Sequence, residues 1–466
     1  MFRSALGSYR NPFALAIIGH CLLFHTASAQ LINSSWNTGN GTWNVPGNWT
    51  PNTAAPNNGA PLVTNTYNVQ IGNLPIANNA QVTFVPPTGT GATISTLTVS
   101  VNADLLTNGN QLNVLGATVV DGAGATIRVD SHALPGTAAL TSLSLNLNNG
   151  GGLTMAGGIA TVSGGQLEIN AGSVLGGNGT VNVGDADGAI EQAFENSALL
   201  QPQGNTAAPQ TLTIHANGVD TIDLDGDTET GIVDIDNALA NTNADTVTLV
   251  VDGPLADPFG AVAGAALQIG QRDTLTFTHD FTIAANAAIS MNGGNNVATL
   301  NGAGNITDIQ GAAFTVTGAA VITNNMTFTG TASTITLNAN SSLELAGTVA
   351  LPDASAVIVP SSTSELIISG STTVTEAAGD FNLDGSGTAT TTIKGTGQLS
   401  LTVNHVDQGD DLFGGTLNLD DDGDMFVNNV ANVWTMAGTL HKRNAGTSAI
   451  SGDAINVTGA VIVDTG

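Results

Sequence analysis

The chain has 466 residues, of which 41% are hydrophobic, only 9% are charged and 4% are aromatic. The 36 Asp and Glu outnumber the seven Lys and Arg, and the resulting net charge of −29 argues against binding to nucleic acid or to anionic membrane surfaces. Recurrent β-branched runs argue against disorder, and the length exceeds that of a single β-sandwich.

Residues 1–29 have the pattern of a signal peptide. Arg3 and Arg10 form a basic start, an apolar stretch covers residues 13–24, and residues 27–29 are small enough for cleavage before Gln30. A membrane anchor is the alternative, but the apolar run is shorter than the roughly 20 residues that a spanning helix needs. We therefore expect an exported protein, outside the cell or at its surface. The mature chain would have no membrane span and, since Cys21 lies in this segment, no disulfide.

Residues 30–73 differ from the rest of the chain. Tryptophan and proline gather here, at Trp36, Trp43, Trp49, Pro46, Pro51, Pro56 and Pro61. Proline at this density excludes a helix and central strands. We predict a Trp/Pro-rich N-terminal cap whose indoles cover the first coil of a solenoid, because an open coil would expose apolar core and unpaired strand edges. An aromatic sugar-binding platform is the alternative interpretation.

From Tyr67 onward, apolar residues occupy every second position in short runs separated by Gly and Asn. This period of two predicts half-buried strands. Such runs begin at Tyr67, Ile94, Leu143, Phe314, Met326, Ile335, Leu343 and Leu399. Between Phe314 and Leu345 the apolar pairs recur about every ten residues, so we expect two strands and roughly twenty residues in each coil. The predicted fold class is all-β, with a right-handed parallel β-helix, or β-solenoid, over residues 74–466.

Two segments interrupt this pattern. Residues 252–266 contain Pro254 and Pro258 and predict either a loop or a break between two solenoid segments. Residues 188–209 are also irregular, and residues 190–194 fit a single helical turn. A string of β-sandwiches is the alternative architecture, but it predicts Pro-rich linkers, and no such linker is evident in the sequence.

Residues 220–236 carry the candidate metal ligands. Asp223, Asp225, Asp227 and Asp234 reproduce the 1, 3, 5, 12 spacing of the oxygen ligands in a calcium loop. However, Thr228 stands where such a loop needs glycine, and its twelfth position is Asp in place of Glu. Residues 382–388 and 420–424 are weaker matches. Calcium is thus the one cofactor that the sequence suggests, and the alternative is that Asp-Gly pairs form solenoid corners in an acidic protein.

No constellation in the sequence indicates catalysis. A glycosidase needs two carboxylates about 5–9.5 Å apart, which the pairs Asp220/Asp223 and Asp410/Asp411 could supply from adjacent coils. A lyase for acidic sugars needs cations, which are scarce here. The histidines after residue 29 show no metal-ligand spacing; they are His132, His215, His279, His405 and His441. We therefore expect no catalytic residues and no enzymatic activity.

The segment that begins at Trp36 resembles a known family. Trp36, Gly41-Thr42-Trp43, Asn48-Trp49, Pro51 and Pro56-Asn57 precede the strand pattern of residues 67–71. This order is similar to the opening of bacterial secreted proteins with autotransporter-associated β-strand repeats. The Gly-, Asn- and Thr-rich body is similar too, in phrases such as residues 153–158 and 434–439. The resemblance covers the chain after residue 29 and implies a parallel β-helix, exposed at the cell surface or released, often with no assigned activity.

The chain departs from autotransporters proper, which carry a C-terminal outer-membrane barrel, and from the many relatives that end in a sorting anchor. It stops at residues 461–466 within a repeat, so the sequence does not support export through a self-encoded pore and suggests a truncated gene product. We predict a secreted or cell-surface structural or adhesin-like solenoid without catalytic activity. Its expected partners are surface polysaccharides or cell-envelope components. The alternatives are a polysaccharide-active β-helix enzyme, as glycoside hydrolase or lyase, and a calcium-binding carbohydrate-binding module.

Overall fold

The structure is a computed structural model, and it describes a large part of the chain. The described residues are 30–464 except 61, 73–79, 88, 90, 133, 138, 186, 204–208, 228–229, 237–244, 309–310, 329–332, 352–356, 377–388, 404–411, 430–433 and 454. The expected signal peptide, the acidic turn at residues 382–388 and the pair Asp410/Asp411 lie outside the described residues.

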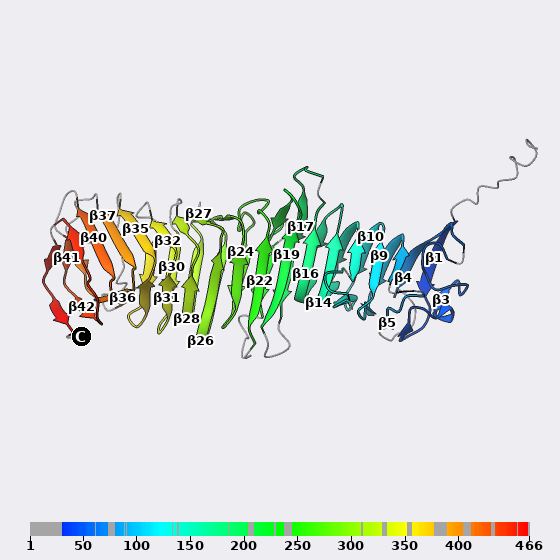
Figure 1. Ribbon diagram of the computed structural model, residues 1–466, viewed down its shortest axis with the longest axis horizontal. Helices are drawn as coiled ribbons and strands as arrows, with labels where there is room; N and C mark the ends of the chain where they lie inside the picture. The colour runs from blue at the N-terminus through cyan, green and yellow to red at the C-terminus, as the bar shows by residue number, and fades with distance from the viewer. Residues whose placement is uncertain are drawn as a thin grey trace, which may run out of the picture.

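The described chain forms one long parallel β-solenoid (Figure 1). Strands at the same place in successive coils pair in parallel, so three ladders run along the molecule. The helical structure assigned within the described residues is a single 3-10 turn, η1 (Pro46–Asn48). The all-β solenoid predicted from the alternation is therefore confirmed.

Each ladder is a row of stacked strands. The first contains β2 (Gly41–Thr42), β5 (Ala80–Thr83), β8 (Ala103–Leu106), β11 (Thr126–Asp130), the first parts of β14 (Gly152–Val162) and β16 (Val174–Val183), β18 (Leu199–Pro202), β21 (Ile232–Ile235), β23 (Ala266–Ile269), the first parts of β26 (Ala288–Gly302) and β28 (Ala313–Ile322), β30 (Thr334–Leu337) and β33 (Val357–Pro360). Three further strands take the same place in the coil order: β38 (Leu412–Phe413), β41 (Trp434–Met436) and β44 (Ile455–Val457).

The second ladder contains β6 (Gly91–Ile94), β9 (Gln111–Val114), β12 (Leu140–Ser142), the second parts of β14, β16, β26 and β28, β19 (Gln210–Ala216), β22 (Val247–Asp252), β24 (Thr274–Phe277), β31 (Ser342–Leu345), β34 (Glu365–Ile368), β36 (Thr390–Ile393), β39 (Thr416–Asp420), β42 (Thr439–Arg443) and β45 (Ala460–Val463).

The third ladder has two parts. One contains β3 (Trp49–Thr50), β1 (Gln30–Trp36), β4 (Asn65–Ile71), β7 (Thr96–Ser100), β10 (Ala117–Asp121), β13 (Ser144–Asn148), β15 (Leu167–Ile169), β17 (Gln192–Asn196) and β20 (Thr221–Asp223). The other contains β25 (Phe281–Ile283), β27 (Ile306–Asp308), β29 (Met326–Phe328), β32 (Thr348–Leu351), β35 (Ser371–Glu376), β37 (Gln398–Val403), β40 (Asp424–Asn429) and β43 (Ile450–Gly452).

A coil contains three strands, not the two expected from the sequence. Ala313 pairs with Thr334, which lies 21 residues on, and Thr334 pairs with Val357, another 23 residues on. The expected number of strands was wrong because two strands in this stretch do not alternate visibly. Ala320 in β28 is buried but too small to mark an inward position, and β32 has three apolar residues in succession.

The core is a narrow column along the axis of the solenoid. Inward side chains such as Leu145 and Leu147 of β13 are 0% exposed, whereas the residues between them face outward. The buried side chains form one cluster that extends from Trp36 to Met436. Since burying one aliphatic side chain contributes about 1.5–3 kcal/mol, each coil is stabilised mainly by stacking on its neighbours.

Glycine allows the longest strands to turn from one face to the next. Gly318 in β28 has φ +72°, and a Cβ at this position would lie 2.4 Å from the backbone nitrogen of Gly294 in the coil before it. Because an L side chain is disfavoured at positive φ and has no room here, this corner accepts glycine alone.

The helical turn expected at residues 190–194 was wrong. Residues from Gln192 onward form β17, in which Phe194 pairs with Leu167 of β15 and is fully buried. Packing of this aromatic side chain on the previous coil overrides the weak local helical pattern.

The three N-terminal tryptophans lie together at one end of the core. Trp49 contacts Trp36 and Trp43 edge to face, with ring centroids 5.0 and 4.8 Å apart, and Trp43 contacts Phe84 at 5.1 Å. All three indoles are 0% exposed, so they offer no open face to a sugar, contrary to the alternative interpretation. Their role as a cap stays a prediction.

Candidate functional site

The third ladder is interrupted between β20 and β25. The segment between β22 and β23 contributes two isolated parallel bridges there, Ile222 to Leu255 and Phe259 to Ile283. Pro254 and Pro258 have no N–H to donate to a ladder, which explains why no regular strand forms. The first and second ladders continue past the same point, through the pairs β21–β23 and β22–β24.

Asp223 and Asp225 lie beneath this interruption, at the end of β20 and in the turn that follows. The Asp223 carboxylate accepts the backbone N–H groups of Asp225 at 2.9 Å and Gly226 at 2.8 Å. The Asp225 carboxylate accepts the N–H of Gly260 at 2.9 Å and of Val262 at 3.4 Å, which attaches the irregular segment to the coil before it. Both residues are 1% exposed.

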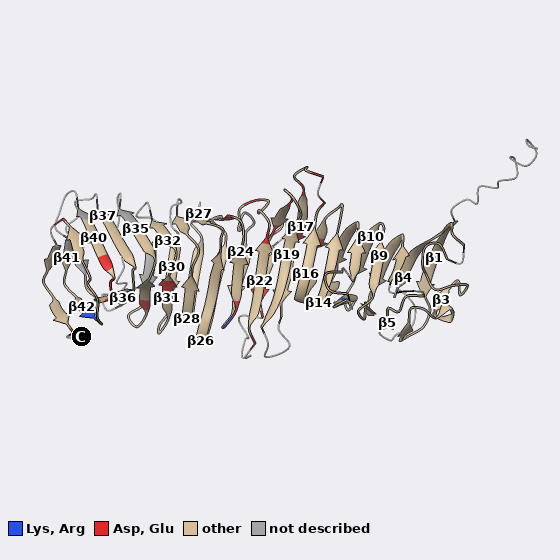
Figure 2. Ribbon diagram, in the orientation of Figure 1, with Lys and Arg blue, Asp and Glu red and all other residues tan. Residues whose placement is uncertain are grey.

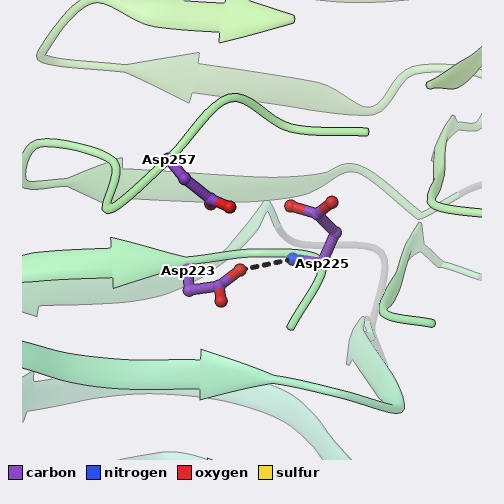
Figure 3. Close-up of side chains that lie close together, drawn as sticks. All are labelled: Asp223, Asp225 and Asp257. Carbon is purple, nitrogen blue, oxygen red and sulfur yellow. Dashed lines mark hydrogen bonds between the residues drawn. The ribbon is translucent and has the colours of Figure 1, made fainter. Parts of the chain in front are cut away.

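Asp257, from the irregular segment, completes a cluster of three carboxylates. Oxygen atoms of Asp223, Asp225 and Asp257 all lie within 4.8 Å of one another, and the carboxylates of Asp225 and Asp257 point toward each other in Figure 3. Asp257 is half-buried, and in Figure 3 its carboxylate lies beside that of Asp225, with Asp223 below them. Three carboxylates at this separation offer the oxygen ligands that Ca²⁺ prefers.

Burial dominates the electrostatics of the cluster. It raises the pKa of Asp223 to about 7, although two backbone hydrogen bonds act in the opposite direction. Burial also raises the pKa of Asp225 to about 6 against its hydrogen bonds to Gly260 and Val262. The pKa of Asp257 is raised by burial and by the nearby negative charge of Asp227. These carboxyl groups therefore favour the neutral form unless a cation compensates them.

The structure unites only part of the ligand set predicted from the spacing. Asp223 and Asp225 come together, and Asp227 lies exposed near Asp257. Asp234 lies in β21 of the first ladder, where it accepts a hydrogen bond from the Gln201 amide at 3.1 Å. Asp257 was missed because the calcium-loop spacing compares only residues within one short segment of the sequence. A solenoid, in contrast, brings together residues that lie one coil apart. The Pro254 and Pro258 break was the available signal. Calcium binding stays a prediction.

Other acidic candidates hold the chain in place. Asp220 is buried and accepts the backbone N–H groups of Asp185 at 3.0 Å and Glu191 at 3.2 Å. In the turn at residues 420–424, Asp420 forms a two-point ion pair with Arg443 at 2.7 and 2.8 Å. These contacts give both carboxylates a structural role.

A hollow of about 430 Å³ adjoins the cluster at Asp257 and is lined by Pro254, Leu255, Ala256, Asp257, Pro258, His279, Asp280 and Thr282. Asp257 is the residue that this hollow and the cluster share. Asp223 and Asp225 are closed to solvent, so the hollow is the part of the site that a ligand can reach.

Two histidines that are far apart in the sequence are linked through Asp252 and Thr278, and one of them, His279, lines the hollow. Asp252 contacts His215 Nδ1 at 2.7 Å and accepts a hydrogen bond from the Thr278 hydroxyl at 2.6 Å. The same hydroxyl lies 3.0 Å from His279 Nδ1. The hydroxyl of Thr278 and the ring of His215 lower the pKa of Asp252, which keeps this carboxylate ionised. This row of side chains follows the stacking of three coils and was not visible from spacing.

Comparisons with known proteins identify no family. No family model matches the chain, and no curated protein matches it. Among solved structures, it is similar to the crystal structure of a hyper-glycosylated TibA fragment whose glycosylation TibC catalyses. The identity is 12%, over 83% of this chain and 96% of that one, with a TM-score of 0.27. Within the described residues, no helix is both long and apolar enough to cross a bilayer.

Proposed function

We propose that this protein is an extracellular or cell-surface structural or adhesin-like solenoid that acts without catalysis. The observation that carries the proposal is the pattern of hydrogen bonds made by the outward polar side chains. These side chains form hydrogen bonds mainly to the neighbouring coil, in rows along the molecule. An enzyme would instead gather charged and aromatic groups in one cleft.

One such row shows the pattern. Asp280 accepts the side-chain amide of Asn305 at 3.0 Å, and Asn305 accepts that of Asn325 at 3.2 Å. Asn325 in turn accepts the backbone N–H of Thr348 at 3.0 Å. Four coils are thus joined by one chain of hydrogen bonds, which suits a rigid rod that displays its faces (Figure 1).

The charge distribution supports the choice of partner. Asp and Glu dominate the charged residues along the solenoid, and Lys and Arg are few (Figure 2). Such a surface attracts neither nucleic acid nor anionic lipid. Neutral surface polysaccharides or cell-envelope components are the partners that we propose, and the signal-peptide pattern of residues 1–29 supports an extracellular or cell-surface location.

The alternative is a polysaccharide-active enzyme, and the hollow beside Asp257 is the observation in its favour. A glycosidase must expose two carboxylates to the scissile bond. Asp223 and Asp225 are each 1% exposed, and the second carboxylate that lines the hollow, Asp280, accepts the backbone N–H and the side-chain amide of Asn305 at 2.9 and 3.0 Å.

A panel of neutral and acidic polysaccharides separates the two functions. The full chain is incubated with each polymer, and new reducing ends, unsaturated products and retained protein are measured in the same tubes. We expect retention on at least one neutral polymer without turnover. Turnover that disappears in Asp257→Asn, but persists in the control Asp245→Asn, would establish the enzyme. Neither retention nor turnover on any polymer would contradict a glycan-binding adhesin.

A further inference from the structure

The interrupted third ladder leaves a hollow between β20 and β25. The irregular segment lines it with residues 254–258, and the coil that follows lines it with His279, Asp280 and Thr282. Its volume of about 430 Å³ lies within the range of about 300–1,000 Å³ that is typical of small-ligand sites. The hollow is therefore large enough to hold one ring of a larger ligand.

The lining of the hollow combines apolar surface with carboxylate acceptors. Pro254, Leu255 and Pro258 supply C–H groups and are only partly buried. Asp257 and Asp280 supply carboxylate oxygens, which accept hydrogen bonds and donate none when ionised. Among the described residues that line the hollow, none is Lys or Arg. A ligand that fits this lining has C–H faces, several hydrogen-bond donors and no negative charge.

Asp280 can bind a ligand although it belongs to a row of side chains between coils. It accepts the backbone N–H and the side-chain amide of Asn305, and both bonds end on Oδ1. Because the residue is exposed, its Oδ2 atom can accept from a molecule in the hollow. Asp257 is half-buried in the same hollow. Acceptors from two successive coils thus border one hollow, which suits a ring with hydroxyl groups on several carbons.

The row of asparagines continues from the hollow along the solenoid. Asn325 donates its side-chain amide to Asn305, as Asn305 does to Asp280, and both asparagines are exposed. Strands of successive coils lie about 4.8 Å apart, which is close to the length of one sugar residue in an extended polysaccharide. The row therefore has the spacing that a polysaccharide chain needs.

We propose that the hollow binds one pyranose ring of a neutral polysaccharide and that the next rings follow the row of Asn305 and Asn325. This assignment rests on the proposed function, because it takes a neutral glycan as the partner. A C–H face of the ring packs on the two prolines, and its hydroxyl groups donate to Asp257 and Asp280. A chain of uronates is repelled by the same two carboxylates.

Isothermal titration calorimetry with hexasaccharides of glucose, mannose and galactose tests the site in the full chain. At least one of them should bind, and the hexasaccharide of galacturonate should not. Asp257→Ala should weaken binding about tenfold or more, because it removes a hydrogen bond to a charged acceptor. The matched control is Asp245→Ala, since Asp245 is also half-buried but does not line the hollow. Circular dichroism confirms that both variants fold.

The length of the ligand tests the row. Asn325→Ala should weaken binding of the hexasaccharide and leave binding of the matching disaccharide unchanged, whereas an equal effect on both would overturn the row. Binding that Asp257→Ala leaves unchanged would overturn the hollow as the site while the glycan-binding function stands. If none of the three neutral hexasaccharides binds, both are contradicted. A glucosamine hexasaccharide that binds only before N-acetylation would indicate a cation site and overturn the assignment to a neutral ring.

Discussion

At the residue scale, the carboxyl groups of Asp223 and Asp225 show two opposing effects at one place. Each accepts two backbone N–H groups, and such bonds favour the ionised form. Each is also 1% exposed, which favours the neutral form. Burial is the larger effect, since it raises the pKa values to about 7 and about 6.

We predict that this pair makes the protein less stable as the pH rises. Both folded pKa values lie above the ordinary value of 3.8, so folding takes up protons between these limits. The contribution of the pair is complete below pH 3.8 and is lost as the pH rises through about 6 and about 7. At about 1.4 kcal/mol for each pKa unit, the loss amounts to several kcal/mol and is measurable by urea unfolding at pH 4 to 8.

The double variant Asp223→Asn/Asp225→Asn isolates this contribution from the rest of the acidic surface. Its stability should change less with pH than that of the parent, and Asp245→Asn should follow the parent curve. If the double variant keeps the full pH dependence, the raised pKa values do not belong to these two carboxyl groups.

Calcium is the second prediction at this scale, because a divalent cation would compensate the same carboxylates at neutral pH. Millimolar Ca²⁺ at pH 7.5 should raise the unfolding temperature, as any ligand of the folded state does. The increase should be lost in Asp257→Asn and kept in Asp234→Asn. The opposite result would favour the ligand set predicted from the sequence spacing, and no increase in the parent would contradict calcium binding.

At the element scale, the corner at Gly318 predicts a large cost for one methyl group. Gly318→Ala places a Cβ 2.4 Å from the nitrogen of Gly294 at φ +72°. We expect a loss of about 2–4 kcal/mol in the free energy of unfolding. Gly47→Ala is the control, since a Cβ at Gly47 meets nothing within 4 Å. Denaturant unfolding measures both, and equal effects would show that the corner can relax.

Strands were predictable from the sequence where large and polar residues alternate. Leu145 and Leu147 are buried as their alternation predicts, but Leu143, two residues earlier, is 46% exposed, because β13 begins only at Ser144. Alternation shows which residues share a face, but not where the chain turns a corner. Corners depend on glycine conformation and on stacking against the next coil, and a single strand carries neither signal.

At the scale of the whole molecule, the sequence predicted the solenoid but only part of the site. Asp223 and Asp225 are close in sequence, so a local template found them. Asp257 follows Asp225 by 32 residues, and its approach depends on the pairing of Ile222 with Leu255 across one coil. His215 and His279, which are far apart in the sequence and show no metal-ligand spacing, both lie near Asp252 for the same reason. Contacts between coils can be predicted only when the register of strand pairing between those coils is known, and this register follows from packing.

The interruption at residues 252–266 allows a last prediction about the molecule as a unit. Two ladders cross this region without a gap, so the coils on both sides should unfold together. In hydrogen exchange, the amides of β22 and β24 should be protected as well as those of β19 and β28, and thermal unfolding should show one transition. Within the irregular segment, Asp225→Ala should speed exchange of the Gly260 amide about tenfold or more, because it removes the 2.9 Å acceptor. Two separate transitions, with weaker protection of β22 and β24, would instead indicate a boundary between two solenoid segments here.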